Sequence, residues 1–137
     1  MPDSTREGAE KVVVDASAMV DLLVGRSRAA AVQARIEDAV LAAPAHLDLE
    51  VLSALGRMSR AGKLSAEEVD QRLAVLGRMP VTRHMLPGLL AEAWTRRSDM
   101  RLSDALYVEL AAQLDVPLVT TDLRLAKATL RAEPITD

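Results

Sequence analysis

The chain has 137 residues and a formal net charge of −3, which suits one compact domain and neither requires nor excludes a polyanionic partner. Half of its residues are hydrophobic, but only Trp94 and Tyr107 are aromatic, which disfavours a module that grips RNA by stacking bases on aromatic side chains. Cysteine is absent, so disulfides, thiol nucleophiles and cysteine-ligated zinc sites are excluded.

The chain lacks an apolar run of the roughly 20 residues that a membrane-spanning helix needs. Residues 1–10 are polar and lack the apolar stretch of a signal peptide. We therefore expect a flexible lead-in over residues 1–10, one domain over residues 11–137, no membrane contact and a cytoplasmic location.

Short apolar runs alternate with helical patterns along the rest of the chain. Strands are expected at residues 11–15, 40–43, 79–82, 116–121 and 134–136. Helices are expected between them, at residues 17–24, 27–38, 46–61, 65–78, 86–97, 103–114 and 123–129. Ser65 and Glu68 have the spacing of a capping box, and Gly25 and Gly62 are placed to end helices.

This order predicts an α/β domain in which right-handed crossovers build a parallel sheet flanked by helices, with two helices filling a crossover. In open parallel sheets, ligands bind beyond the carboxyl ends of the strands. Asp15 and Asp122 each follow an expected strand, so both are predicted to lie at that edge.

Three aspartates have ordinary structural explanations when each is taken singly. Asp15 and Asp122 can cap the helices that follow them, and Asp104 suits the dipole in the first turn of its helix.

Glu50 lies in a helix that carries apolar residues nearly all round. It belongs to a narrow stripe of polar and small residues that includes His46 and Arg57, so it can pair with either or be exposed.

The four acidic residues carry more weight together. Two carboxylates about 4 Å apart repel by roughly 4 kcal/mol at an effective dielectric near 20. A hard divalent cation removes that conflict, because Mg²⁺ and Mn²⁺ prefer oxygen ligands. We therefore predict a Mg²⁺ or Mn²⁺ site formed by Asp15, Glu50, Asp104 and Asp122.

At this point the sequence resembles a known family. Residues 13–18, 104–111 and 118–125 look like the three signature segments of PIN-domain ribonucleases, and the VapC-type toxins of bacterial toxin–antitoxin pairs are the most similar subgroup. Glu50 resembles the second acidic position of that family. The resemblance runs from about residue 11 to residue 135 and departs at Ser103, where relatives often carry an aromatic residue.

The resemblance implies a PIN-like (Rossmann-like) parallel sheet in a three-layer arrangement and an endoribonuclease that uses Mg²⁺ or Mn²⁺. It also implies an RNA substrate, a small cognate antitoxin that holds the protein inactive, and a homodimer. By position, the metal ligands and catalytic residues would be Asp15, Glu50, Asp104 and Asp122, and the family's hydroxyl positions would be Ser17 and Thr120.

The expected chemistry is metal-assisted hydrolysis of a phosphodiester, in which Asp15 and Asp104 hold the principal ion and Glu50 and Asp122 complete the site. No His, Ser or Cys nucleophile is required, so both histidines, His46 and His84, are expected to be structural or at the surface.

The arginines near the acidic residues have two explanations each. Arg124 can reach a phosphate or belong to a solvated helix face. The group of Arg96, Arg97 and Arg101 can follow an RNA backbone or only keep its loop soluble.

Two other functions remain open. A receiver-like phosphotransfer domain also binds Mg²⁺ with acids at strand ends, but it needs an adjacent acidic pair that Asp15 lacks. A non-catalytic PIN-fold module that binds RNA is the second, and the four carboxylates argue against it.

Overall fold

The computed structural model describes residues 8–136, so residues 1–7 of the expected lead-in and Asp137 lie outside the described residues. Five parallel strands form one sheet in the order β3-β2-β1-β4-β5. The strands are β1 (Lys11–Val14), β2 (Val40–Pro44), β3 (Val81–His84), β4 (Leu118–Thr120) and β5 (Ala132–Pro134). The predicted parallel sheet is confirmed.

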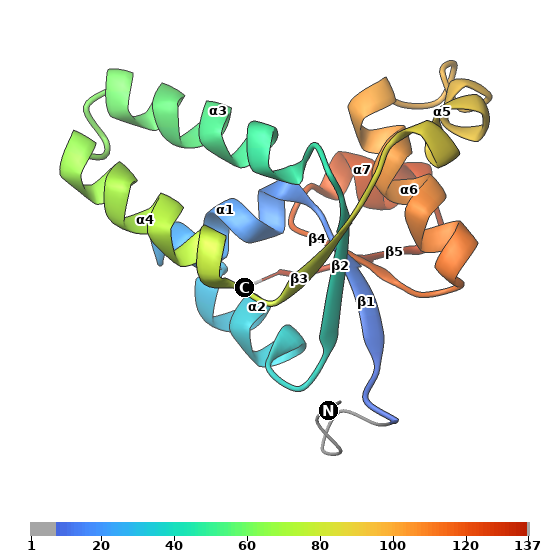
Figure 1. The fold of residues 1–137 in the computed structure, drawn as a ribbon, viewed down its shortest axis with the longest axis horizontal. Coiled ribbons are helices and arrows are strands. Elements are labelled where there is room, and N and C mark those ends of the chain that lie inside the picture. The colour runs from blue at the N-terminus through green and yellow to red at the C-terminus, as the bar shows by residue number, and fades with distance from the viewer. Residues whose placement is uncertain (1–7, 137) are drawn as a thin grey trace.

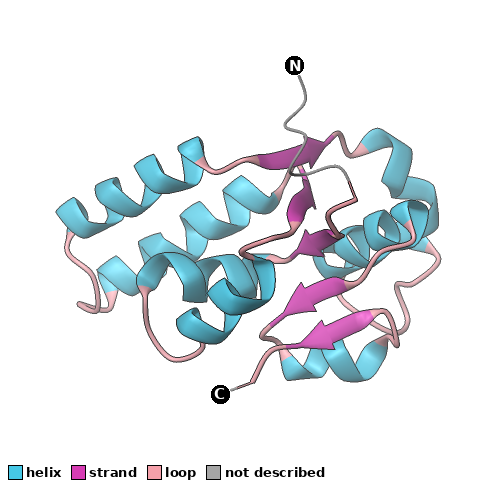
Figure 2. Cartoon of the chain, turned by 90° about the horizontal axis from the view of Figure 1, so that it is seen from below, coloured by secondary structure: helices cyan, strands magenta, loops and turns pink. Residues whose placement is uncertain are grey.

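Helices cover both faces of this sheet (Figures 1 and 2). On one side lie α1 (Ala16–Val24), α2 (Ala29–Ile36), α3 (Leu47–Arg60) and α4 (Ala66–Arg78). On the other lie α5 (Pro87–Trp94), α6 (Leu102–Leu114) and α7 (Leu123–Ala128). The three layers predicted from the sequence are confirmed, and each of the first three crossovers is filled by two helices.

Several element boundaries differ from the prediction by one to three residues; for example, β3 covers Val81–His84 and not 79–82, and β4 covers Leu118–Thr120 and not 116–121. Helix α5 ends at Trp94, because the next amides turn back on carbonyls three residues earlier, as in the bond from Arg96 N–H to the Ala93 carbonyl. The last strand covers Ala132–Pro134 and pairs with the short β4, so Ile135 contributes only one further bond, to the Thr120 carbonyl.

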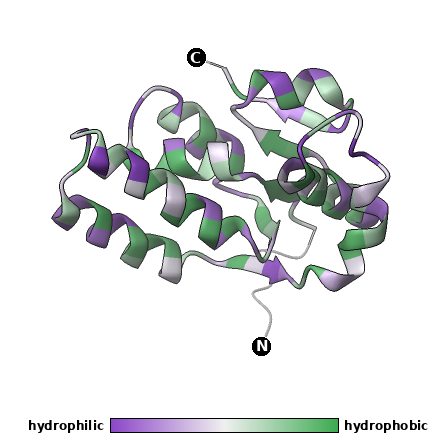
Figure 3. Cartoon of the chain, turned by 90° about the horizontal axis from the view of Figure 1, so that it is seen from above, coloured by the Kyte–Doolittle hydropathy of each residue, from purple (hydrophilic) through white to green (hydrophobic). Residues whose placement is uncertain are grey.

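The core is built from the aliphatic residues that the composition made available. The inner residues of β1, Val12, Val13 and Val14, have no exposed surface, and Met19 and Leu55 pack over the sheet from α1 and α3. Hydrophobic colour accordingly follows the central strands, whereas the helices are striped (Figure 3). Within residues 8–136, no helix is both long enough and apolar enough to cross a membrane.

The order of the strands decides where a ligand site can form. From β1 the chain proceeds to β2 and β3 on one side, then returns to place β4 directly beside β1, with Val14 paired to Val119. The connections that leave β1 and β4 therefore run in opposite directions and leave a crevice beyond the carboxyl ends of these two strands. Asp15 and Asp122 both follow at this edge.

Candidate metal centre

Asp15 is a charged group buried at the centre of the sheet edge, with 4% of its surface exposed. Its Oδ1 caps α1 by accepting the Ala18 N–H at 2.9 Å and also accepts the Ser17 hydroxyl at 2.7 Å. Its Oδ2 accepts the Thr120 hydroxyl at 2.5 Å. Burial raises the pKa of Asp15 to about 6, against the opposing effect of these hydrogen bonds. Asp15 thus serves as a helix cap and as a member of the acidic group at once.

Asp122 is fixed to the same point through Thr120. The Thr120 hydroxyl donates to Asp15 and accepts the Asp122 N–H at 2.9 Å. One carboxylate oxygen of Asp122 caps α7 by accepting the Arg124 N–H at 2.9 Å, as the sequence predicted. Its other oxygen lies toward Arg101, at 3.9 Å.

Asp104 joins the group from the first turn of α6. Burial raises the pKa of Asp104 above its usual range, and the charges of Asp122 and Glu50 raise it further, whereas Arg101 at 3.3 Å opposes the increase. The Asp104 charge in turn contributes to the raised pKa of Asp15. Asp104 therefore lies within electrostatic range of the other three predicted acidic residues, although the four come from separate parts of the chain.

Glu50 enters from α3, where it is held by two aromatic side chains. The Tyr107 hydroxyl donates to Glu50 Oε1 at 2.6 Å, and His46 Nε2 lies 3.4 Å from the same oxygen. The pairing with His46 that the sequence left open is thus present. The helix is less buried than its sequence suggested, because Leu49 and Leu52 are 63% and 48% exposed.

His46 and Tyr107 belong to the site but were not assigned to it from the sequence. The His46 side chain is 11% exposed and its ring centroid lies 4.6 Å from that of Tyr107, which agrees with the structural role that the sequence analysis allowed for it. The usable signals were local: His46 stands one helical turn before Glu50, and Tyr107 one turn after Asp104.

The donors at this edge fit a hard divalent cation, because all four ligand candidates offer carboxylate oxygens. Burial is the main cause of the raised pKa values of Asp15 and Asp104, and neighbouring carboxylates add to it, so a bound cation would favour the ionised form of both. As the side chains stand in residues 8–136, no three acidic or histidine side chains are close enough together to ligate one ion. Metal binding at this edge would therefore need side-chain rotation or bridging water.

The arginines expected near RNA separate into two sets. Arg101 and Arg124 lie at the acidic edge, at 3.9 and 3.6 Å from Asp122. Arg96 instead pairs at 3.4 Å with the buried Glu109, and Arg97 stacks on the Trp94 ring at 4.7 Å. Arg96 therefore forms its ion pair within its own layer of helices, away from the acidic edge.

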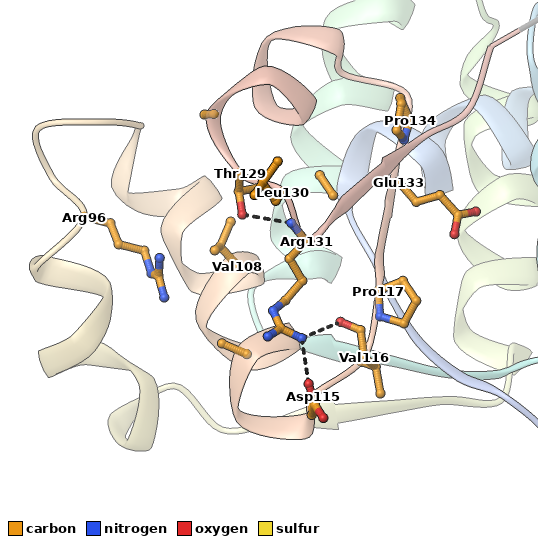
Figure 4. Close-up of a pocket in the computed structure, with 13 residues that line it drawn as sticks. Arg96, Val108, Asp115, Val116, Pro117, Thr129, Leu130, Arg131, Glu133 and Pro134 are labelled. Carbon is orange, nitrogen blue, oxygen red and sulfur yellow. Dashed lines mark hydrogen bonds and ion pairs between the residues drawn. The ribbon is translucent and has the colours of Figure 1, made fainter.

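Two hollows adjoin the acidic group. One, of about 420 Å³, lies between α1 and α3 and includes Ser17, Glu50 and Arg57. The other, of about 260 Å³, lies beside α7 and includes Asp104 and Arg124. A larger hollow of about 1020 Å³ runs along β5, shares no residue with the acidic group, and has Arg131 tied to Asp115 and the Val116 carbonyl (Figure 4).

Comparison with known proteins gives consistent matches. The PIN domain family model matches residues 12–129. Ribonuclease VapC3 of Mycobacterium tuberculosis is 58% identical over 127 residues, which cover 92% of this chain and 93% of that protein. Ribonuclease VapC1 of the same organism is 39% identical over 121 residues, which cover 87% and 91%.

A solved structure agrees with these sequences. The crystal structure of PAE2754 from Pyrobaculum aerophilum superposes with a TM-score of 0.66 at 25% identity, covering 92% of this chain and 85% of that one. The region that the family model matches contains all four acidic positions, strands β2 to β4 and all of β1 except Lys11. The chain belongs to the PIN-domain family and, within it, to the VapC-type ribonucleases.

Proposed function

We propose that this protein is a Mg²⁺- or Mn²⁺-dependent endoribonuclease whose metal ligands and catalytic residues are Asp15, Glu50, Asp104 and Asp122. The observation that carries the proposal is that Asp15 and Asp122 follow β1 and β4 at the switch point of the sheet, with Asp104 in electrostatic range of both and of Glu50. VapC relatives of similar length carry the name ribonuclease, which supports RNA as the substrate.

Asp15 and Asp104 would hold the principal ion, and Asp122 and Glu50 would bind through water or complete a second position. When bound, the cation supplies an activated water and offsets the negative charge that develops on the scissile phosphate. The surrounding residues pre-organise these ligands: Ser17 and Thr120 fix Asp15, and Tyr107 fixes Glu50.

Family membership argues against a receiver-like phosphotransfer domain, and a cleavage assay separates the nuclease from a PIN module that only binds RNA. In Mn²⁺, Asp104→Asn should reduce RNA cleavage to background and weaken Mn²⁺ binding measured by calorimetry. Asp70→Asn, an exposed carboxylate on α4, is the matched control and should leave both unchanged. EDTA should stop cleavage by the unaltered protein, and full activity of Asp104→Asn would overturn the assignment.

We further propose that a small cognate antitoxin binds the protein in the cytoplasm and that two copies form a homodimer, as the VapC-type family membership suggests. Exposed apolar side chains on α3 and α5 support a protein partner: Leu49, Leu52, Leu90 and Trp94. Light scattering of the free protein tests the homodimer, and affinity capture of the tagged protein from its native cells, followed by mass spectrometry for a small co-purifying protein, tests the antitoxin.

A further inference from the structure

The hollow between α1 and α3 is lined by small side chains and by arginines, and neither is accounted for by the proposed metal site. Glu50, Ala54 and Arg57 face it from successive turns of α3. Small side chains form part of its lining, Ala16 and Ser17 at the start of α1 together with Ala54, and Val20 and Asp21 of α1 also line it. Small residues in the lining of a hollow that opens on the acidic edge leave room for a chain to lie against the protein.

Arginines from separate elements surround this hollow: Arg57 from α3, Arg28 from the turn before α2, and Arg101 from the turn before α6. Arg57 is exposed, and its side chain forms no ion pair or hydrogen bond within residues 8–136. Arg28 has only a loose pairing with Asp21, at 4.0 Å.

Arg28 also has a hydrogen-bond donor that is not satisfied by the protein. Its Nε is buried and has no hydrogen-bond partner in the described part of the chain. A buried donor without an acceptor is costly, and a shift of the Arg28 side chain toward an anionic oxygen in the hollow would relieve that cost. Arg28 Nε and the Arg57 guanidinium thus both lack a partner within residues 8–136, and both indicate an anionic ligand.

We propose that this hollow is a subsite for a backbone phosphate of the RNA strand, with Arg57 and Arg28 as its donors. Arg57 lies two helical turns from Glu50, roughly 10 Å along the helix axis, so it would hold a phosphate next to the scissile one. The strand would enter over the small side chains and cross the acidic edge. This inference rests on the proposed nuclease function. It assigns a role to two arginines that the proposed metal site of four carboxylates does not involve.

The test compares Arg57→Ala and Arg28→Ala with Arg60→Ala, an exposed arginine on α3 that does not line the hollow. Each protein is titrated in EDTA with a fluorescein-labelled, random-sequence single-stranded RNA, read by anisotropy from 50 to 200 mM salt. A lost phosphate contact reduces the slope of log K against log salt by about 0.7 for single strands. Circular dichroism establishes that each variant is folded.

We expect Arg57→Ala and Arg28→Ala each to weaken RNA binding roughly tenfold and to lower the salt slope by about 0.7, with Arg60→Ala unchanged. In Mn²⁺, KM should rise by a similar factor while kcat stays within about twofold, because the contact is made equally in the ground and transition states. A methylphosphonate at the contacted linkage should weaken binding to the unaltered protein but not to Arg57→Ala, which would locate the phosphate.

The outcomes separate the two proposals. Cleavage by the unaltered protein, with Arg57→Ala and Arg60→Ala indistinguishable in KM and salt slope, would overturn the subsite and leave the nuclease intact. Binding that depends on Arg57, without cleavage in any divalent metal, would support the subsite and overturn the nuclease. Failure of the unaltered protein to bind RNA would overturn both.

Discussion

The hydroxyl of Tyr107 on α6 donates a 2.6 Å hydrogen bond to the carboxylate of Glu50 on α3. Burial raises the pKa of Tyr107 above its usual range, and the charge of Glu50 raises it further, so the phenol remains a donor at any physiological pH. The His46 ring packs against the Tyr107 ring at an interplanar angle of 43°, and its Nε2 donates to the Ser103 carbonyl at 2.9 Å. The helix that carries Asp104 thus also sets the position of Glu50.

Replacement of Tyr107 by Phe should expose the role of this bond. The ring remains, so the core stays filled, but Glu50 loses its donor. We expect Mn²⁺ affinity to fall roughly tenfold, as for other groups that orient a ligand, and the free energy of unfolding to fall by about 1 kcal/mol. Calorimetry with Mn²⁺ and urea unfolding measure the two effects.

A double-mutant cycle separates positioning from general damage. If Tyr107 acts through Glu50, then Tyr107→Phe should have little further effect on Mn²⁺ affinity in a Glu50→Gln background. An equal loss of affinity in both backgrounds would show that the phenol acts elsewhere.

Asp15→Asn should stabilise the metal-free protein above pH 6. The pKa of Asp15 is about 6 in the folded state and 3.8 when unperturbed, so the native state binds more protons between these values. Stability therefore falls as the pH rises through that window, and the ionised form costs about 3 kcal/mol above it. Asparagine avoids that cost, because its carbonyl can accept from Ser17 and Ala18 while its amide donates to the Thr120 oxygen.

Urea unfolding in EDTA from pH 4.5 to 8 measures this difference. The stability gap between Asp15→Asn and the unaltered protein should open as the pH rises and become constant above pH 6. Asp70→Asn controls for the loss of one negative charge. A gap that is flat or that closes with rising pH would contradict the buried-charge explanation.

The sheet, its parallel direction and the order of the helices and strands were predictable because the signals are local, whereas several boundaries differ by one to three residues. β1 is a β-branched run and α4 begins with a capping box that the structure contains. Right-handed crossovers fix the strand order only once it is known that the chain returns from β3 and places β4 beside β1. Nothing local in residues 118–120 encodes that choice.

The convergence of acidic residues on one edge of the sheet was predictable from the sequence, whereas the side chains that hold them in position were not. Asp15 and Asp122 follow strands, so their shared edge follows from parallel topology. His46 and Tyr107 act through a contact between α3 and α6, and Arg28 lines the same hollow as Arg57 only because of the turn before α2. Such contacts depend on how helices pack, which the spacing of residues within each helix does not specify.

Metal binding should weaken as the pH falls through about 6. A cation must displace the proton from Asp15, so below its pKa the apparent Mn²⁺ dissociation constant should rise about tenfold per pH unit. The raised pKa of Asp104 should make the dependence steeper. Calorimetry in two buffers of different ionisation enthalpy counts the released protons. Affinity that is constant from pH 7.5 to 5 would contradict a role for Asp15 as a ligand.

Ser65→Ala should reduce stability and leave the chemistry alone. Ser65 Oγ accepts the Glu68 N–H at 3.0 Å and Glu68 Oε1 accepts the Ser65 N–H at 3.0 Å, which satisfies two backbone donors at the start of α4. Loss of this cap should lower the free energy of unfolding by about 1 kcal/mol, and Ser65→Asn should restore most of it. Neither residue lines a hollow beside the acidic group, so kcat, KM and Mn²⁺ affinity should match the unaltered protein below the melting temperature. A change in KM that persists where both proteins are fully folded would instead mean that the turn between α3 and α4 couples to the site.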